Sequence, residues 1–241
     1  MRMLTFARRV TKEILTDPLN LAFGLGFPLV LLFLLSAIQA NIPVQMFEIG
    51  HLTPGITVFG LAFITLFSAT MIAKDRSSAL LQRLYTTPLR PVDFILGYTL
   101  PILPISVAQC AICYVAAVLL GLEITVNILY GILLIVPVAV LYIGLGLLCG
   151  SVLNDKQVGG ICGALLTNLS AWLSGIWFDL NLVGDTFRKI AYALPFVHAV
   201  EMERAVLAGN FGDIFPHLGW VLAYAAVSLI AAIWLFLRQM K

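Results

Sequence analysis

Six long runs of this chain contain no Asp, Glu, Lys, Arg or His. Each run is long enough for a helix that crosses a hydrocarbon core of ~30 Å, which takes about 20 residues. All 14 Lys and Arg and all 12 Asp and Glu therefore fall between or outside the runs. This pattern predicts an all-α membrane protein with six transmembrane helices, at Leu19–Ile38, Pro54–Ala73, Ile95–Leu120, Ile128–Leu153, Val158–Phe178 and Leu218–Leu237.

The composition leaves little room for anything besides these helices. Hydrophobic residues make up 61% of the 241 residues and charged residues only 11%, whereas soluble domains are roughly 25% charged. We therefore expect one transmembrane domain, residues 1–241, without a soluble catalytic domain beside it.

The distribution of basic residues predicts the orientation. If the N-terminus is placed inside, eleven Lys and Arg fall in inner segments and only Arg188, Lys189 and Arg204 in outer ones. Inner loops carry the excess of Lys and Arg in membrane proteins. We expect a multi-pass protein of the plasma membrane of a prokaryote, with both termini in the cytoplasm.

Two segments outside the runs have helical patterns of their own. Residues 1–17 carry apolar side chains at helical spacing and Arg8, Arg9 and Lys12 on the other face, which predicts an amphipathic helix in the membrane interface. Residues 179–217 form a long outer segment with two short helical patterns, separated at Pro195. Long loops usually contain structure, so we expect extracellular re-entrant helices before the last span.

The spans lack the groups that other mechanisms need. An ion-coupled carrier or a channel usually has ionisable residues at membrane depth. An intramembrane enzyme needs paired carboxylates, a Ser–His pair or metal ligands there. Both remain alternatives, but the uncharged spans favour a non-enzymatic protein whose energy comes from elsewhere.

Neither set of possible metal ligands is persuasive. Cys110 and Cys113 form a C-x-x-C pair within a span, without a second pair or a His nearby, and are better explained as small packing residues. The second set lies in the outer segment and consists of His198, Glu201, Glu203 and Arg204. It is better explained by an ion pair of Arg204 with a carboxylate than by a metal site. We expect no bound metal.

Several short motifs occur in a recognisable order. The first is Pro54-Gly55-Ile56, followed by Ile72-Ala73-Lys74-Asp75-Arg76 and Arg83-Leu84-Tyr85-Thr86-Thr87-Pro88-Leu89. Pro195-Phe196-Val197-His198 and, after five further residues, Arg204 complete the series. Together with the topology, these motifs resemble the type-two family of ABC export permeases over essentially the whole chain. The chain departs from the family at Ser78-Ala79, where members often have Gly.

The resemblance implies a permease subunit that works as a homodimer or heterodimer with two copies of a cytosolic ABC ATPase. ATP and Mg²⁺ would bind to that ATPase, because this chain has no G-x-x-x-x-G-K-[ST] loop and is expected to hold no cofactor. Membrane lipids are the other expected partners, and nucleic acid is not one.

The family likeness also assigns residues to the contact with the ATPase. Residues 74–94 would form a cytoplasmic loop with a coupling helix that seats in a cleft of the ATPase. The apolar side chains on one face of this helix could pack in a groove of the ATPase, and its Arg side chains could contact polar groups at the rim of that groove. The expected coupling residues are Asp75, Arg76, Leu80, Arg83, Leu84 and Tyr85.

In the same family, spans two and five of the two subunits face each other around the path. We expect an aromatic, uncharged path formed by Phe59, Phe63, Phe67, Thr70, Asn168 and Trp172. Such a path suits an amphipathic cargo, namely a drug, a lipid or a lipid-linked saccharide. An outer gate is expected at Pro195, His198, Glu201 and Arg204.

Overall fold

A computed structural model describes residues 2–42, 47–78 and 91–239. Within these ranges the regular elements are helices, two of them π-helical and one a 3₁₀-helix. In chain order they are α1 Arg2–Leu15, α2 Pro18–Leu21, η1 Ala22–Gly26 (π), α3 Phe27–Gln39, α4 Ile49–Ser77, α6 Pro91–Leu119, α7 Val126–Val152, α8 Asp155–Val158, η2 Gly159–Leu166 (π), α9 Thr167–Leu173, η3 Leu180–Leu182 (3₁₀), α10 Asp185–Tyr192, α11 Pro195–Leu207 and α12 Phe211–Gln239.

The prediction of an all-α membrane protein is confirmed. In the described ranges, 5 helices are long and apolar enough to span a membrane, at residues 22–39, 49–77, 92–119, 126–152 and 211–238. The predicted fifth run is helical from Asp155 to Leu173, but it consists of α8, the π-helical η2 and α9. It is not among the 5, so a sixth span stays a prediction.

Several predicted boundaries are wrong. α4 begins at Ile49, and Pro54 lies inside it. Pro54 lies in the second turn of α4, so the helix begins about one turn before the proline and lacks the bond that an N–H at position 54 would donate. The fifth run ends at Leu173 rather than Phe178, since the chain turns at Gly175 with φ 70°. α12 already begins at Phe211, so His217 belongs to that helix and not to the loop before it.

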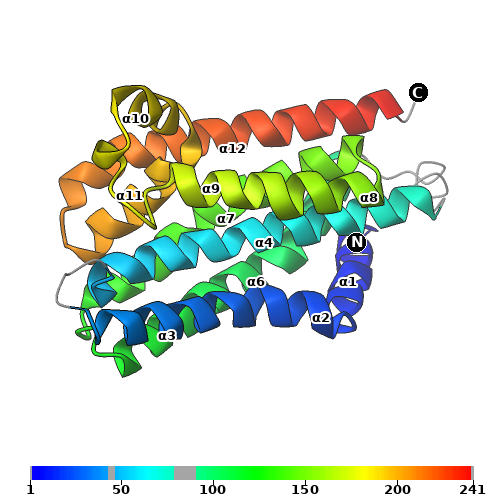
Figure 1. The fold of residues 1–241 in the computed structure, drawn as a ribbon. Helices are drawn as coiled ribbons and strands as arrows, with labels where there is room; N and C mark the ends of the chain where they lie inside the picture. Colours follow the sequence, from blue (N-terminus) through cyan, green and yellow to red (C-terminus); the bar gives the residue numbers. More distant parts are fainter. Residues whose placement is uncertain (1, 43–46, 79–90, 240–241) are drawn as a thin grey trace.

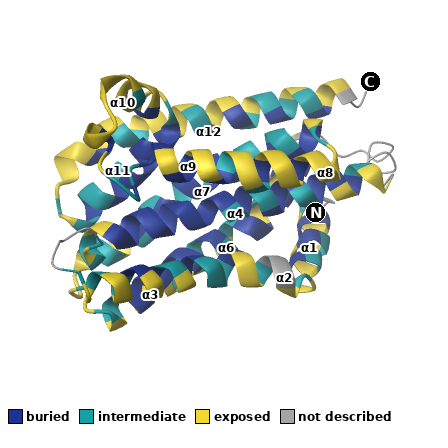
Figure 2. Cartoon of the chain, in the orientation of Figure 1, coloured by how far each residue is buried: buried dark blue, intermediate teal, exposed yellow. Residues whose placement is uncertain are grey.

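The long helices lie side by side with α4 in the middle, and α3 and α9 flank it (Figure 1). Burial follows this arrangement, because 83% of the most apolar 18-residue stretch of α4 is buried, but only 22% of residues 22–39 in the first span. In Figure 2, α4 is dark over most of its length, while α9 and α3 show exposed faces. The centre of the bundle is therefore formed mainly by α4 and by α7 packed against it.

Small residues bring α4 and α7 into close contact. A Cβ atom at Gly150 would lie 2.7 Å from the backbone oxygen of Ala69. The hydroxyl of Thr65 donates a hydrogen bond of 2.7 Å to the backbone oxygen of Tyr142. Close backbone approach at small residues is the usual way in which helices associate in lipid.

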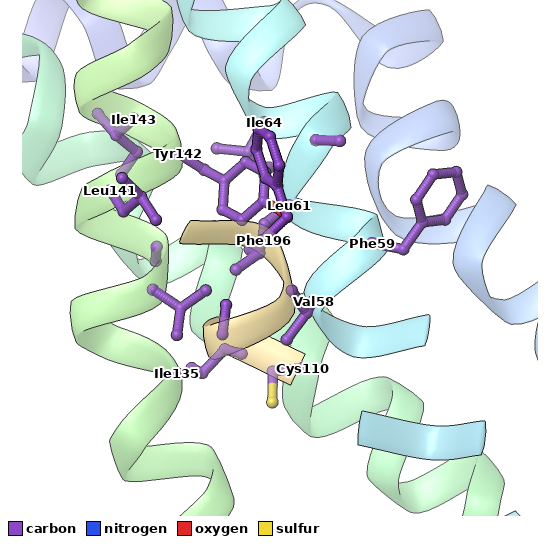
Figure 3. Close-up of a cluster of buried hydrophobic side chains, with 14 of the residues drawn as sticks. Val58, Phe59, Leu61, Ile64, Cys110, Ile135, Leu141, Tyr142, Ile143 and Phe196 are labelled. Atoms are coloured by element: carbon purple, nitrogen blue, oxygen red, sulfur yellow. The ribbon is translucent and has the colours of Figure 1, made fainter. Parts of the chain in front are cut away.

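The core beside this contact is apolar. Figure 3 shows Leu61 and Ile64 of α4 packed near Tyr142 of α7 and Phe196 of α11, whereas Phe59 points away toward the side of α3. The core thus joins α11, which lies outside the 5 candidate spans, to the central helices.

The two ends of the bundle differ. α1 runs across the long helices at the end where α8 and the C-terminus lie, and α10 and α11 cap the opposite end (Figure 1). A helix that crosses the bundle axis at one end has the geometry expected of an interfacial helix. The two predicted helices of the outer segment are present as α10 and α11.

Candidate transport path and its two ends

An aromatic series runs along the face of α4 that meets α3. The rings of Phe59 and Phe63 are 5.7 Å apart, and Phe63 is 5.0 Å from Phe27 of α3. Phe59 in turn lies 5.8 Å from Trp177, just after α9. Phe67 is buried one turn beyond Phe63. These Phe side chains therefore pack against neighbours in their own chain.

The other residues of the predicted path have different surroundings. Thr70 donates to the backbone oxygen of Leu66 at 2.9 Å. Asn168 is exposed and donates to the backbone oxygen of Ala164 at 2.7 Å, and Trp172 is 53% exposed on α9. Because Phe59 and Phe67 are buried while Asn168 and Trp172 are exposed, the six residues do not form one continuous surface of this chain. Their role in transport stays a prediction.

A cavity of about 600 Å³ lies at the end of the aromatic series, between the start of α4, the turn after α9, and α10 and α11. Its walls combine aromatic rings with carboxylates, an amide and a guanidinium. The polar and aromatic lining residues include Glu48, His51, Trp177, Phe178, Asp179, Asn181, Tyr192, Glu201 and Arg204. We call it the outer cavity.

Arg204 crosslinks three elements at the outer cavity. Its Nη1 pairs with Glu201 Oε1 at 2.9 Å, and its Nη2 donates to the backbone oxygen of Gly175 at 3.0 Å. Its Nε donates to the backbone oxygen of His51 at 3.4 Å. Burial lowers the pKa of Arg204. Arg204 thus holds α11 to the turn after α9 and to the start of α4, and its predicted gating role is untested.

His198 lies on the other side of α11, against α12. Its ring stacks on Trp220 at 5.0 Å with an interplanar angle of 4°. Nε2 donates to the backbone oxygen of Tyr192 at 3.0 Å, and Nδ1 lies 2.8 Å from Nδ1 of His217. A carbonyl only accepts, so neutral His198 carries its proton on Nε2 and accepts from His217 at Nδ1. Pro195 is buried at the start of this helix.

Glu203 is a buried carboxylate that the sequence reasoning did not place inside the bundle. The residue is 0% exposed, and Tyr114 of α6 donates to its Oε2 at 3.3 Å. Its Oε1 has no hydrogen-bond partner among the described residues. Burial raises the pKa of Glu203 to about 8, so the carboxyl is neutral at pH 7.

The position of Glu203 has a signal in the sequence. Phe196, Ala199, Val200 and Glu203 follow each other at i, i+3, i+4 and i+7, which places the carboxylate on the apolar face of α11. Within the described ranges no cluster of three or more potential metal ligands is found.

At the opposite end, Asp75 joins α4 to two other helices. Arg9 of α1 donates to both carboxylate oxygens, at 2.9 and 2.7 Å, and the hydroxyl of Tyr98 of α6 donates at 2.7 Å. Arg9 also pairs with Glu13 at 2.9 Å. The hydrogen bonds to Asp75 raise the pKa of Arg9. Sequence reasoning missed Arg9 and Tyr98 as partners, because nothing in their local pattern points to Asp75.

Arg76 caps the neighbouring helix. Its Nη1 donates to the backbone oxygen of Gly150 at 2.8 Å and of Leu153 at 3.3 Å, at the end of α7. Asp75 and Arg76 thus contact their own chain. The other predicted coupling residues, as well as Ala79, lie outside the described residues, and these are Leu80, Arg83, Leu84 and Tyr85.

Three features define the class of the protein, namely its long apolar helices, the helix α1 that crosses them at one end, and the polar cavity at the other end. It is a multi-pass helical membrane protein with the features of a transport subunit.

Comparison with known sequences identifies the family. Residues 38–234 match the sequence profile of the ABC-2 family transporter protein. The chain belongs to this family, and it is a permease subunit of an ABC exporter.

Two curated relatives illustrate the similarity. The chain is 24% identical to Nodulation protein J of Bradyrhizobium diazoefficiens over 227 residues, which cover 94% of this chain and 85% of the relative. It is 28% identical to Capsule polysaccharide export inner-membrane protein CtrC of Neisseria meningitidis serogroup A over 131 residues. That alignment covers 54% of this chain and 48% of the relative.

Proposed function

We propose that this chain is one of the two membrane subunits of an ATP-driven exporter whose cargo is a lipid-linked saccharide. It works with a second permease subunit and with two copies of a cytosolic ATPase that bind ATP and Mg²⁺. The outer cavity carries the proposal, because its lining suits the saccharide and its position suits the end of an export path. The name of CtrC, a capsule polysaccharide export protein, supports the same cargo.

The chemistry of the outer cavity fits a sugar better than a purely apolar drug. Trp177 and Tyr192 offer flat apolar faces, while Asp179, Glu201 and Asn181 offer oxygens and amide groups that bind hydroxyls. Small-molecule sites combine apolar walls with a few placed polar groups in this way. The lipid part of the cargo would follow the exposed apolar face of α9, which carries Leu169 and Trp172 and ends at the turn that lines the outer cavity.

The exposed face of the fifth run supports a dimer. Ile161, Leu165, Leu169 and Trp172 are exposed at helical spacing along η2 and α9, and a Cβ at Gly159 or Gly160 would meet nothing within 4 Å. Apolar stripes with small residues suit helix association in lipid. A second permease subunit packed on this face would enclose the path between spans two and five.

Energy would enter at the end of α4. ATP binds differently to separated and closed ATPase subunits, so it can shift the permease between two states only through a physical contact. The segment that follows Ser77 would provide that contact on the cytoplasmic side. Asp75 would pass its movement to α1 and α6, and Arg76 would pass it to α7.

The test is reconstitution with the cognate ATPase in proteoliposomes. A polyprenyl-phosphate-linked oligosaccharide should stimulate ATP hydrolysis. Trp177→Ala should lower the stimulation about tenfold, which corresponds to about 1.4 kcal/mol, a cost within the range for an aromatic anchor. Trp234→Ala, an exposed position on α12, is the matched control. Equal loss in both variants, or stimulation by drugs but not by the saccharide, would contradict the proposed cargo.

Glu203 supports one other function, an ion-coupled carrier, because a buried neutral carboxyl is a proton-binding group. Uphill transport by the permease alone, driven by a pH gradient without ATP, would support this alternative. We expect no such transport, and we expect full dependence on the ATPase.

A further inference from the structure

A second, larger cavity opens between α1 and α6 at the opposite end of the bundle from the outer cavity. It measures about 820 Å³, and its walls are mainly apolar. Leu4 and Ala7 of α1 form one wall, and Leu100, Pro104 and Ile105 of α6 form the other. We call it the α1–α6 groove.

The groove lies beside fixed contacts that hold its shape. Phe6 of α1 packs against Phe94 at 5.7 Å and Tyr98 at 5.0 Å, and a Cβ at Gly97 would clash with the Phe6 ring. Arg9 adds the ion pair with Asp75 on the same flank. α1 is thereby anchored to α6 and α4 along one side, while its other side borders the open groove.

The charges of α1 divide between these two sides. Arg9 is paired with Glu13 and Asp75. Arg8 and Lys12 line the groove, four residues apart and both exposed, and no ion pair to either is found within the described residues. The groove therefore combines apolar walls with two uncompensated positive charges on one helix face.

We infer that the α1–α6 groove binds one anionic phospholipid of the membrane that surrounds the protein. Its phosphate lies between Arg8 and Lys12, and an acyl chain follows Leu100 and Ile105 of α6. Charge complementarity selects the headgroup, because Lys and Arg beside a membrane attract anionic lipids. A helix that crosses the bundle end at the interface places those charges at headgroup level.

A lipid bound in the α1–α6 groove would also support the position of α1. It fills the open side of α1 and braces that helix against α6, next to the ion pair that reaches the end of α4. The composition of the membrane would then affect how firmly α1 holds this end of the bundle.

The experiment measures lipid binding to the purified full-length permease by native mass spectrometry, with palmitoyl-oleoyl phosphatidylglycerol and the matching phosphatidylcholine as probes. We expect about tenfold tighter binding of the first phosphatidylglycerol molecule. The double variant Arg8→Gln/Lys12→Gln should abolish this preference and leave phosphatidylcholine binding unchanged. Lys156→Gln/Lys189→Gln, which removes two exposed charges elsewhere, should keep the preference.

A third variant separates a built site from general surface charge. Thr11→Trp keeps both cations but fills the groove, because Thr11 lines it and is exposed, so it should also remove the tight binding. Normal binding to Thr11→Trp, or equal losses in the two charge variants, would overturn the inference. Melting curves establish that each variant is folded. Neither ATPase nor cargo is present, so failure here leaves the proposed export function untouched.

Discussion

The two ends of this bundle are held by different sets of polar contacts. At the α1 end, Arg9, Asp75 and Tyr98 form an ion pair with a supporting hydroxyl. At the α11 end, Arg204 pairs with Glu201, Glu203 is buried with one hydrogen bond, and the rings of His198 and His217 share one hydrogen bond. The α1 end depends on charge alone, whereas the α11 end combines the Arg204–Glu201 ion pair with buried groups that favour the neutral form.

The difference suggests how each end responds to its surroundings. Arginine stays charged at every ordinary pH, so acid or base affects the guanidinium of Arg9 little. Glu203 and His198 have pKa values displaced by burial toward the neutral form. The α11 end is therefore the one at which protonation can loosen or tighten the helices, and the following three changes test that contrast in order of expected effect.

The largest effect is expected from Asp75→Ala. This change leaves the guanidinium of Arg9 and the hydroxyl of Tyr98 without their shared partner. Because the Arg9 side chain is 38% exposed and keeps Glu13, we expect a loss of about 2 kcal/mol, as for a hydrogen bond to a charged group. Thermal melting of the purified protein should show a clear fall in Tm. Lys74→Ala, an exposed neighbour on α4, should melt like the unchanged protein. Similar melting of both variants would show that the ion pair does not hold this end.

Glu203→Gln should change the pH dependence of stability. Below pH 4.5 the carboxyl is protonated both folded and unfolded, whereas above about 8 it is ionised in both. Between these values the folded state binds the extra proton, so stability falls as pH rises. Melting from pH 5 to 8 should show a fall in Tm that the variant lacks. An identical slope in both proteins would mean that Glu203 titrates normally.

The smallest effect is expected from His198→Phe, which keeps an aromatic ring on Trp220. Burial lowers the pKa of His198 below its ordinary 6.5, so the unfolded state takes up the proton first and stability falls as pH drops below 6.5. Melting curves between pH 5 and 7 should show that the variant loses part of this acid sensitivity. If acid destabilises both proteins equally, the His pair is not the sensitive contact.

The fold class could be read from the sequence because hydrophobicity and charge exclusion act over whole helices. The boundaries could not be read so well. Pro54 looks like a helix start, yet α4 begins at Ile49 and continues through the proline in its second turn, so the local preference of proline did not decide the boundary. The fifth run looks uniform, but the structure divides it by the π-helical η2 before it ends at Leu173.

The candidate sites were predictable only where chemistry is local. An ion pair between Arg204 and a nearby carboxylate follows from their spacing along a helix, and Glu201 is that partner. The partners of Asp75 are Arg9 and Tyr98, which lie 66 and 23 residues away in sequence. Contacts at such separations depend on how the helices pack, and a single sequence carries little information about them.

The close contact between α4 and α7 has a practical consequence for protein engineering. A methyl group at Gly150 would collide with the backbone of Ala69. Almost any substitution at Gly150 should therefore push the two helices apart and destabilise the fold. The outward positions of α3, such as Phe33 and Leu34, are exposed and can accept large changes in shape. A library meant to alter what the exporter carries should vary the walls of the outer cavity, such as Trp177 and Asn181, and leave the contact between α4 and α7 unchanged.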